Sequence, residues 1–97
     1  MRCYFVNVCG RLAWSIGKTD PDAFEPAGLS GLRYVLASNE TAAVSKAIDQ
    51  IEADLVEKYG WDCAINPTVD WSVEEVRQSS YFKLLSGKYG FIFNREE

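Results

Sequence analysis

The chain has 97 residues, 47% of them hydrophobic and 13% aromatic, which predicts one folded domain over residues 1–97 rather than a disordered chain. Its 14 Asp and Glu residues outnumber 10 Lys and Arg, and the net charge of −4 disfavours a long basic surface for nucleic acid. No run of about 20 apolar residues is present, so we expect no transmembrane helix and no membrane partner.

The first expected element is a strand over residues 2–9, R-C-Y-F-V-N-V-C. It is apolar on both alternating faces, as is typical of a central strand. Gly10-Arg11 suits a tight turn or a bulge. Residues 12–16 suit either an extension of the strand or its return as a hairpin, and the sequence leaves both open.

Residues 17–31 are rich in Gly and Pro and contain Asp20, Asp22 and Glu25, which predicts a long loop. Loops longer than about 12 residues are uncommon without a role, so this segment is a candidate functional loop. The alternative is a surface excursion anchored by Phe24 and Leu29.

A short strand over residues 32–37 leads into the strongest feature of the sequence, an amphipathic helix over about residues 39–59. Its apolar stripe recurs at steps of three and four residues and consists of Val44, Ala47, Ile48, Ile51, Leu55 and Tyr59. Ser38 is the expected N-cap, and Gly60 is expected to end the helix in a left-handed conformation.

This apolar stripe must be buried on a sheet, because a helix of this length cannot bury it alone. We expect Ile48, Ile51 and Leu55 to pack against the sheet. On the sheet side the expected contacts are Trp71 together with Tyr4 or Phe5.

Residues 68–77 alternate between apolar and polar side chains, which favours a strand after the Asn66-Pro67 turn. The alternation breaks at Glu74-Glu75, as it does at a β-bulge. A helix capped by Ser72 and Glu75 is the alternative over residues 72–77. A short helix near 79–86, a turn over 87–90 and a last strand over 91–93 complete the expected order.

These elements predict an α+β domain with a mostly antiparallel sheet of about four strands and the long helix on one face. The second face of the sheet is expected to be partly open. Exposed aromatic side chains on that face would offer a surface to a partner.

The sequence contains no histidine, which removes the usual general base near neutral pH and His-ligated metal sites. Cys3, Cys9 and Cys63 lack the CxxC spacing of a structural zinc site, and the odd cysteine count indicates a reducing cytosol. We therefore expect a cytoplasmic protein with no catalytic residues, metal or cofactor.

Two aromatic strings lie on expected strands, K-Y-G-F-I-F at 88–93 and Y-F-V-N-V at 4–8. They resemble the RNP1 and RNP2 strings of RNA-recognition motif domains. That resemblance implies that aromatic side chains such as Phe5 and Phe91 on two central strands would stack on RNA bases. RNA binding by this route stays an alternative, which the negative net charge disfavours.

The acidic residues are the other candidate binding groups. Asp49 and Glu52 lie on one flank of the expected helix, and Asp54 and Glu57 lie on the other. The remaining candidates are Asp70 and Glu74 in the 68–77 segment and Asp20 and Asp22 in the loop. Together they would present carboxylates to a basic protein and compete with nucleic acid, unless they form only a solvated face.

Residues 34–51, a strand running through S-N-E-T into A-A-V-S-K-A-I, are similar to small phage-encoded proteins that include anti-CRISPR proteins. The resemblance implies an inhibitor that mimics nucleic acid and blocks a basic nucleic-acid-binding effector, such as a CRISPR complex. An immunity or antitoxin-type protein that binds a basic toxin is the other alternative.

Overall fold

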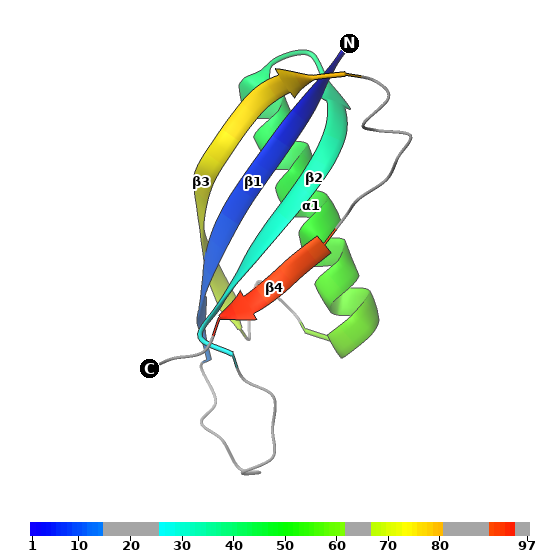
Figure 1. Ribbon diagram of the computed structural model, residues 1–97. Coiled ribbons are helices and arrows are strands. Elements are labelled where there is room, and N and C mark those ends of the chain that lie inside the picture. Colours follow the sequence, from blue (N-terminus) through cyan, green and yellow to red (C-terminus); the bar gives the residue numbers. More distant parts are fainter. Residues whose placement is uncertain (15–25, 62–66, 81–89, 95–97) are drawn as a thin grey trace.

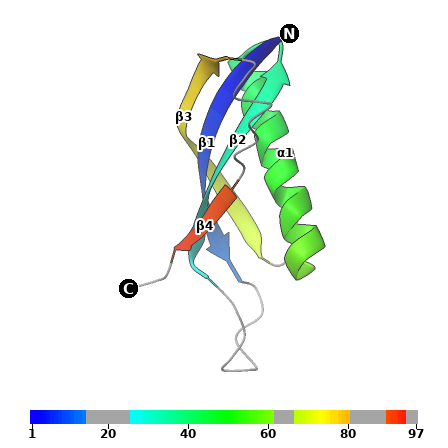
Figure 2. The same cartoon turned by 45° about the vertical axis from the view of Figure 1, so that its right-hand side comes forward.

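The computed structural model describes residues 1–14, 26–61, 67–80 and 90–94. Four strands and one helix lie in these ranges, in the order β1 (Arg2–Ala13), β2 (Gly28–Ala37), α1 (Glu40–Tyr59), β3 (Thr68–Ser79) and β4 (Gly90–Asn94). The strands form one antiparallel sheet in the order β3-β1-β2-β4, and α1 crosses one face of it (Figures 1 and 2). The predicted α+β class, with an antiparallel sheet and a long helix, is confirmed.

The core lies between α1 and the sheet face beneath it. Its buried side chains are Tyr4, Val6, Val8 and Leu12 on β1, Leu29, Val35 and Ala37 on β2, and Ala43, Ala47, Ile51 and Leu55 on α1. Ile48 and Trp71 are half-buried and pack against this cluster. The predicted packing of Ile51 and Leu55 is confirmed, and Tyr4 rather than Phe5 supplies the aromatic contact. Tyr59, the last residue of the predicted stripe, is exposed, so the stripe is not buried along its whole length.

β2 begins at Gly28, so the prediction of a loop through residue 31 is wrong at its C-terminal end. Gly28 and Gly31 suggested a loop because glycine weakens strands. Here, however, residues 28–32 pair with β1 on one side and β4 on the other. Hydrogen bonding on both edges stabilises this segment as a strand, and Leu29 is fully buried. The loop residues Asp20, Asp22 and Phe24 lie outside the described residues.

β1 continues through Ala13, so Gly10-Arg11 neither turns nor bulges the chain. Gly10 is buried opposite Trp71, and a Cβ placed there would lie 2.8 Å from Val69 Cγ1 and 3.0 Å from the Trp71 ring. Glycine is therefore the residue that lets the Trp71 ring lie against β1.

Replacing Gly10 with alanine should destabilise the fold by about 1–3 kcal/mol, because the added methyl group overpacks the Val69 and Trp71 side chains. Urea unfolding monitored by circular dichroism measures this loss. The control is Gly10→Ala combined with Val69→Ala, which removes the nearest contact and should recover part of the loss. If alanine at position 10 costs nothing, Trp71 does not lie against Gly10.

α1 begins one residue later than Ser38 would require, and the prediction of Ser38 as N-cap is wrong. The cap is Asn39, whose backbone is extended (φ −157°) and whose Oδ1 accepts from the Ala42 N–H at 2.8 Å. Because a cap must lie directly before the first helical residue, Ser38 is one position too early. Gly60 ends the helix as predicted, with φ of 69° and its N–H donating to Val56 O at 2.9 Å.

β3 confirms the predicted strand and rules out the alternative helix over residues 72–77. Asn7 pairs with Glu75 and Val8 with Val73, so Glu74 is the extra residue of the predicted bulge. The strand extends to Ser79, which corrects the start of the predicted short helix; residues 81–86 of that prediction lie outside the described residues. β4 contains the predicted last strand over 91–93.

Candidate functional site

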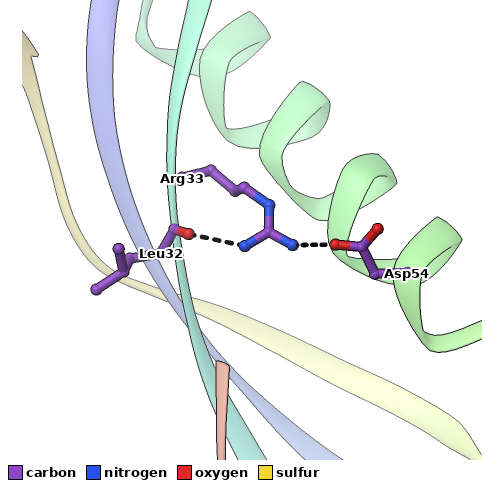
Figure 3. A network of polar contacts seen from close by, with 3 residues as sticks. All are labelled: Leu32, Arg33 and Asp54. Carbon is purple, nitrogen blue, oxygen red and sulfur yellow. Dashed lines mark hydrogen bonds and ion pairs between the residues drawn. The ribbon is translucent and has the colours of Figure 1, made fainter. Parts of the chain in front are cut away.

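Asp54 is one of the residues predicted to contact a partner, and in the structure its carboxylate makes a contact within the fold. Its carboxylate pairs with Arg33, which lies on the α1-facing side of β2 and is only 3% exposed (Figure 3). Arg33 Nη1 also donates to Leu32 O at 2.9 Å. A buried guanidinium needs such acceptors, because removing its charge from water is costly. Asp54 therefore holds α1 to β2.

Glu52 also has a contact within the fold. It accepts a hydrogen bond of 3.3 Å from Trp71 Nε1, which joins the other flank of α1 to β3. These contacts confirm that Glu52 and Asp54 lie on opposite flanks of α1, one toward β3 and one toward β2. Both carboxylates already bind a side chain of the sheet, so neither is fully available to a partner protein.

The other predicted acids in the described residues are exposed. Asp49 and Glu57 lie on α1, and Asp70 and Glu74 lie on β3. Among residues 1–14, 26–61 and 67–80, no side chain forms an ion pair or hydrogen bond with these four carboxylates. They are the acidic groups that a partner could contact at the smallest cost to the fold.

Exposed apolar side chains are also present on α1 and β3. Apart from Met1, the large hydrophobic residues exposed in residues 1–14, 26–61 and 67–80 are Val56 (53%), Tyr59 (42%) and Val73 (47%). On α1, Asp49, Glu52, Val56 and Tyr59 are spaced as one stripe, and Glu52 of that stripe contacts β3. The α1/β3 surface, as we name it, consists of Asp49, Glu52, Val56 and Tyr59 with Trp71, Val73 and Glu74.

Aromatic rings support the C-terminal end of this surface. The Tyr59 ring stacks on Trp61 with centroids 4.9 Å apart, and Trp61 meets Trp14 edge-on at 5.0 Å. The Trp14 indole N–H is fixed by Pro26 O at 2.9 Å. Tyr59 is therefore held in place although it is exposed, which lowers the entropy lost when a partner contacts it.

The sheet face opposite α1 carries a second cluster of polar and aromatic side chains. The Phe5 and Tyr34 rings on neighbouring strands lie 5.3 Å apart, and the Arg77 guanidinium lies 4.6 Å from the centre of the Phe5 ring. Arg77 also pairs with Glu75 at 2.9 Å. Aromatic side chains lie on the second face as expected, but Phe5 and Tyr34 are half-buried rather than exposed, and sequence reasoning missed Tyr34 and Arg77 as members of the cluster.

A pocket of about 470 Å³ lies near the place where Arg11 of β1 pairs with Gly28 of β2. Its lining residues are Cys9, Gly10, Arg11, Ala27, Gly28, Asp70 and Ser72. Cys9 is half-buried with its Sγ 3.8 Å from Ser30 Oγ, and its thiol is free, as is that of the buried Cys3. Cys63 lies outside the described residues.

The pairing of strands does not match the geometry that the two aromatic strings implied. β4 carries residues 90–93 of the RNP1-like string and pairs with β2, so β2 separates it from β1. Phe91 and Phe93 of the RNP1-like string therefore lie on an edge strand that does not neighbour β1, and not on a central strand. Phe5 has Tyr34 beside it instead, and this corrects the arrangement expected from the resemblance.

Within the described part of the chain, no group of three or more Cys, Asp or Glu side chains is placed to hold a metal ion. No helix in these ranges is long and apolar enough to cross a membrane. Comparison of the chain with protein-family models, with curated proteins and with solved structures gave no match. The α1/β3 surface and the cluster of Phe5, Tyr34 and Arg77 are the basis for a functional proposal.

Proposed function

We propose that the chain is a protein-binding inhibitor that contacts a basic partner through the α1/β3 surface. The observation that supports this proposal is the combination of exposed Val56, Tyr59 and Val73 with the carboxylates of Asp49 and Glu74. Interfaces typically combine apolar and aromatic contacts in a centre with polar groups around it. Carboxylates around such a centre steer a basic partner toward it.

The sharpest form of this proposal is a mimic of nucleic acid. Carboxylates that occupy the phosphate-binding groups of a partner would compete with its nucleic acid. The resemblance of residues 34–51 to anti-CRISPR proteins supports a CRISPR effector as the partner and the cytoplasm as the location. An immunity or antitoxin-type protein would use the same surface against a basic toxin.

Reversing charge on the α1/β3 surface should weaken partner binding more than reversing charge elsewhere. We expect Asp49→Lys to lower the association rate about tenfold at low salt, because like charges then oppose encounter. Glu57→Lys makes the same change in net charge on the other flank of α1 and should have a smaller effect. The measurement is surface plasmon resonance against the partner recovered from the native host and identified by mass spectrometry.

The same measurement at rising ionic strength tests the electrostatic origin of the effect. The association rate of the unchanged protein should fall steeply as exposed charges become screened beyond about 8–10 Å. Glu52 is unsuitable as a test site, because its loss also removes the hydrogen bond from Trp71. Equal effects of Asp49→Lys and Glu57→Lys would contradict the α1/β3 surface and indicate net charge alone.

Binding of single-stranded RNA on the second sheet face is a second candidate, favoured by the Phe5, Tyr34 and Arg77 cluster. Aromatic rings stack on bases, and a guanidinium adds charge toward phosphate. In this case Phe5→Ala would abolish binding of a labelled oligonucleotide, whereas Asp49→Lys would strengthen it. The two candidates thus predict opposite signs for the same charge reversal.

A further inference from the structure

β3 is a long strand at the edge of the sheet. It spans Thr68–Ser79, and among the described strands only β1 pairs with it (Figures 1 and 2). An edge strand presents a row of backbone N–H and C=O groups that can pair with another chain. β3 is therefore a candidate for strand addition, in which an extended segment joins the sheet.

The register identifies the backbone groups on the open edge. The Leu12 N–H bonds to Ala27 O on the β2 side, so the odd-numbered residues of β1 direct their backbone groups toward β3. Cys9 pairs with Ser72, so Ser72 faces β1 and Val73 faces outward. Beyond the bulge at Glu74 the outward positions are Val76 and Gln78.

The opposite edge of the sheet differs from this one. β4 pairs with residues 28–32 of β2, and Lys46 Nζ donates to Leu36 O at 3.0 Å farther along the same edge. A lysine at an edge carbonyl is a common way to discourage strand pairing. On β3 the residues from Asp70 to Glu75 contain three acids and no Lys or Arg. Arg77 follows and pairs with Glu75, but the acids of β3 outnumber its basic residues, so this edge repels acidic strands and favours basic ones.

The two faces of β3 specify what an added strand would carry. Val69, Trp71 and Val73 lie on the α1 side, where Val73 is 47% exposed. Asp70, Ser72 and Glu75 lie on the opposite face. They pair with odd-numbered residues of β1, whereas the core side chains of β1 belong to even-numbered residues. Side chains of an added strand alternate between these faces. Apolar residues would cover Val73, and Lys or Arg residues would meet Asp70, whereas Glu75 already pairs with Arg77.

We propose that β3 binds an extended segment of the partner in which apolar and basic residues alternate. This inference rests on the proposed function and names the part of the basic partner that is recognised. A second copy of the chain offers less charge complementarity, because each β3 carries three acids against one Arg, and that Arg77 already pairs with Glu75. The partner segment adds charge complementarity where a second copy adds repulsion.

The probe for this proposal is a fluorescein-labelled peptide of about ten residues, a usual upper length for a strand, in which Lys and Val alternate. Its matched control has the same composition with the Lys and Val residues in two blocks. Fluorescence anisotropy at low salt should give a dissociation constant at least about tenfold lower for the alternating peptide. Two further versions of the alternating peptide, the two phases, carry N-methyl groups on the odd-numbered or on the even-numbered backbone nitrogens. Because only alternate N–H groups face the sheet, methylation should abolish the preference in one phase and not in the other.

Val73→Pro tests the same edge from the protein side. Proline removes the outward N–H of Val73 and leaves the N–H groups that face β1 in place, so the fold should tolerate it. We expect binding of the alternating peptide to weaken at least about tenfold, as for the loss of a backbone hydrogen bond together with a clash at the edge. Circular dichroism checks the fold, and the methylated peptides give the same test without altering the protein.

Three results separate the two proposals. A preference for the alternating peptide that is lost on methylation in one phase supports strand addition. Equal binding of both peptides, insensitive to methylation, overturns strand addition. In that case, sensitivity of partner binding to Asp49→Lys but not to Glu57→Lys retains the proposed function. If neither peptide binds and both lysine variants bind the partner like the unchanged protein, both proposals are wrong.

Discussion

Replacing Ile51 with alanine should lower the free energy of unfolding by about 2–5 kcal/mol. Ile51 is 0% exposed and lies on the core stripe of α1 between Ala47 and Leu55. Alanine removes three carbon atoms from this tightly packed contact and leaves a cavity that the sheet cannot fill. Since a typical domain is stable by only about 5–15 kcal/mol, this single change removes a large part of the total.

Urea unfolding measured by circular dichroism gives this loss, and two variants on the same helix act as controls. Ile48→Ala should cost less, because Ile48 is half-buried at the margin of the core. Val56→Ala should change stability by less than about 0.5 kcal/mol, because Val56 is 53% exposed. Equal losses for Ile51 and Val56 would mean that α1 packs by a different face.

These helix variants also separate folding from binding. Val56 belongs to the α1/β3 surface, so Val56→Ala should weaken partner binding while stability is unchanged. Ile51→Ala should reduce binding only in proportion to the fraction of unfolded protein. A variant with normal unfolding and weak binding therefore identifies a contact residue.

Local patterns were enough to predict α1 and the bulge in β3. The spacing of Ala47, Ile51 and Leu55 specifies which helix face is buried, and Gly60 specifies where the helix ends. The interrupted alternation at Glu74-Glu75 specifies the bulge, because a period of two cannot absorb an extra residue otherwise. Each signal lies within a few residues of the feature it predicts.

The start of β2 could not be predicted in this way. Residues 28–31 form a strand because they pair with β1 and β4, which are far away in the sequence. The local preference of Gly28 and Gly31 for loops is overridden by these partners. The prediction of a tight turn or a bulge at Gly10 is wrong for the same reason, since the role of this glycine depends on the Trp71 ring opposite it.

The acidic residues of the candidate site were predicted from the sequence, but their contacts within the fold were not. Helical spacing correctly separated the flank of Glu52 from the flank of Asp54. The spacing could not show that Glu52 bonds to Trp71 and that Asp54 pairs with Arg33, because both contacts depend on how α1 lies over the sheet. The exposure of Val73 was missed too, since it occupies the apolar side of an alternating strand.

Removing the Asp54 carboxylate should also destabilise the fold strongly. Arg33 is 3% exposed, and Asp54→Ala would leave its guanidinium buried without this carboxylate. Loss of one partner of a buried ion pair typically costs about 3–5 kcal/mol. The Asp54 side chain is 40% exposed, so water can partly replace it, and we expect a loss of about 2–3 kcal/mol. Urea unfolding measures this loss.

The matched variants are Asp54→Asn, which keeps the shape and an acceptor oxygen, and the double variant Arg33→Met with Asp54→Leu. The double variant removes both charges and should be more stable than Asp54→Ala, because the interior then holds no guanidinium that has lost its carboxylate. If Asp54→Ala unfolds like the unchanged protein but no longer binds the partner protein, Asp54 contacts that protein and does not stabilise the fold. If stability and binding fall together while Asp54→Asn keeps part of both, the carboxylate acts through Arg33 and the position of α1 on β2.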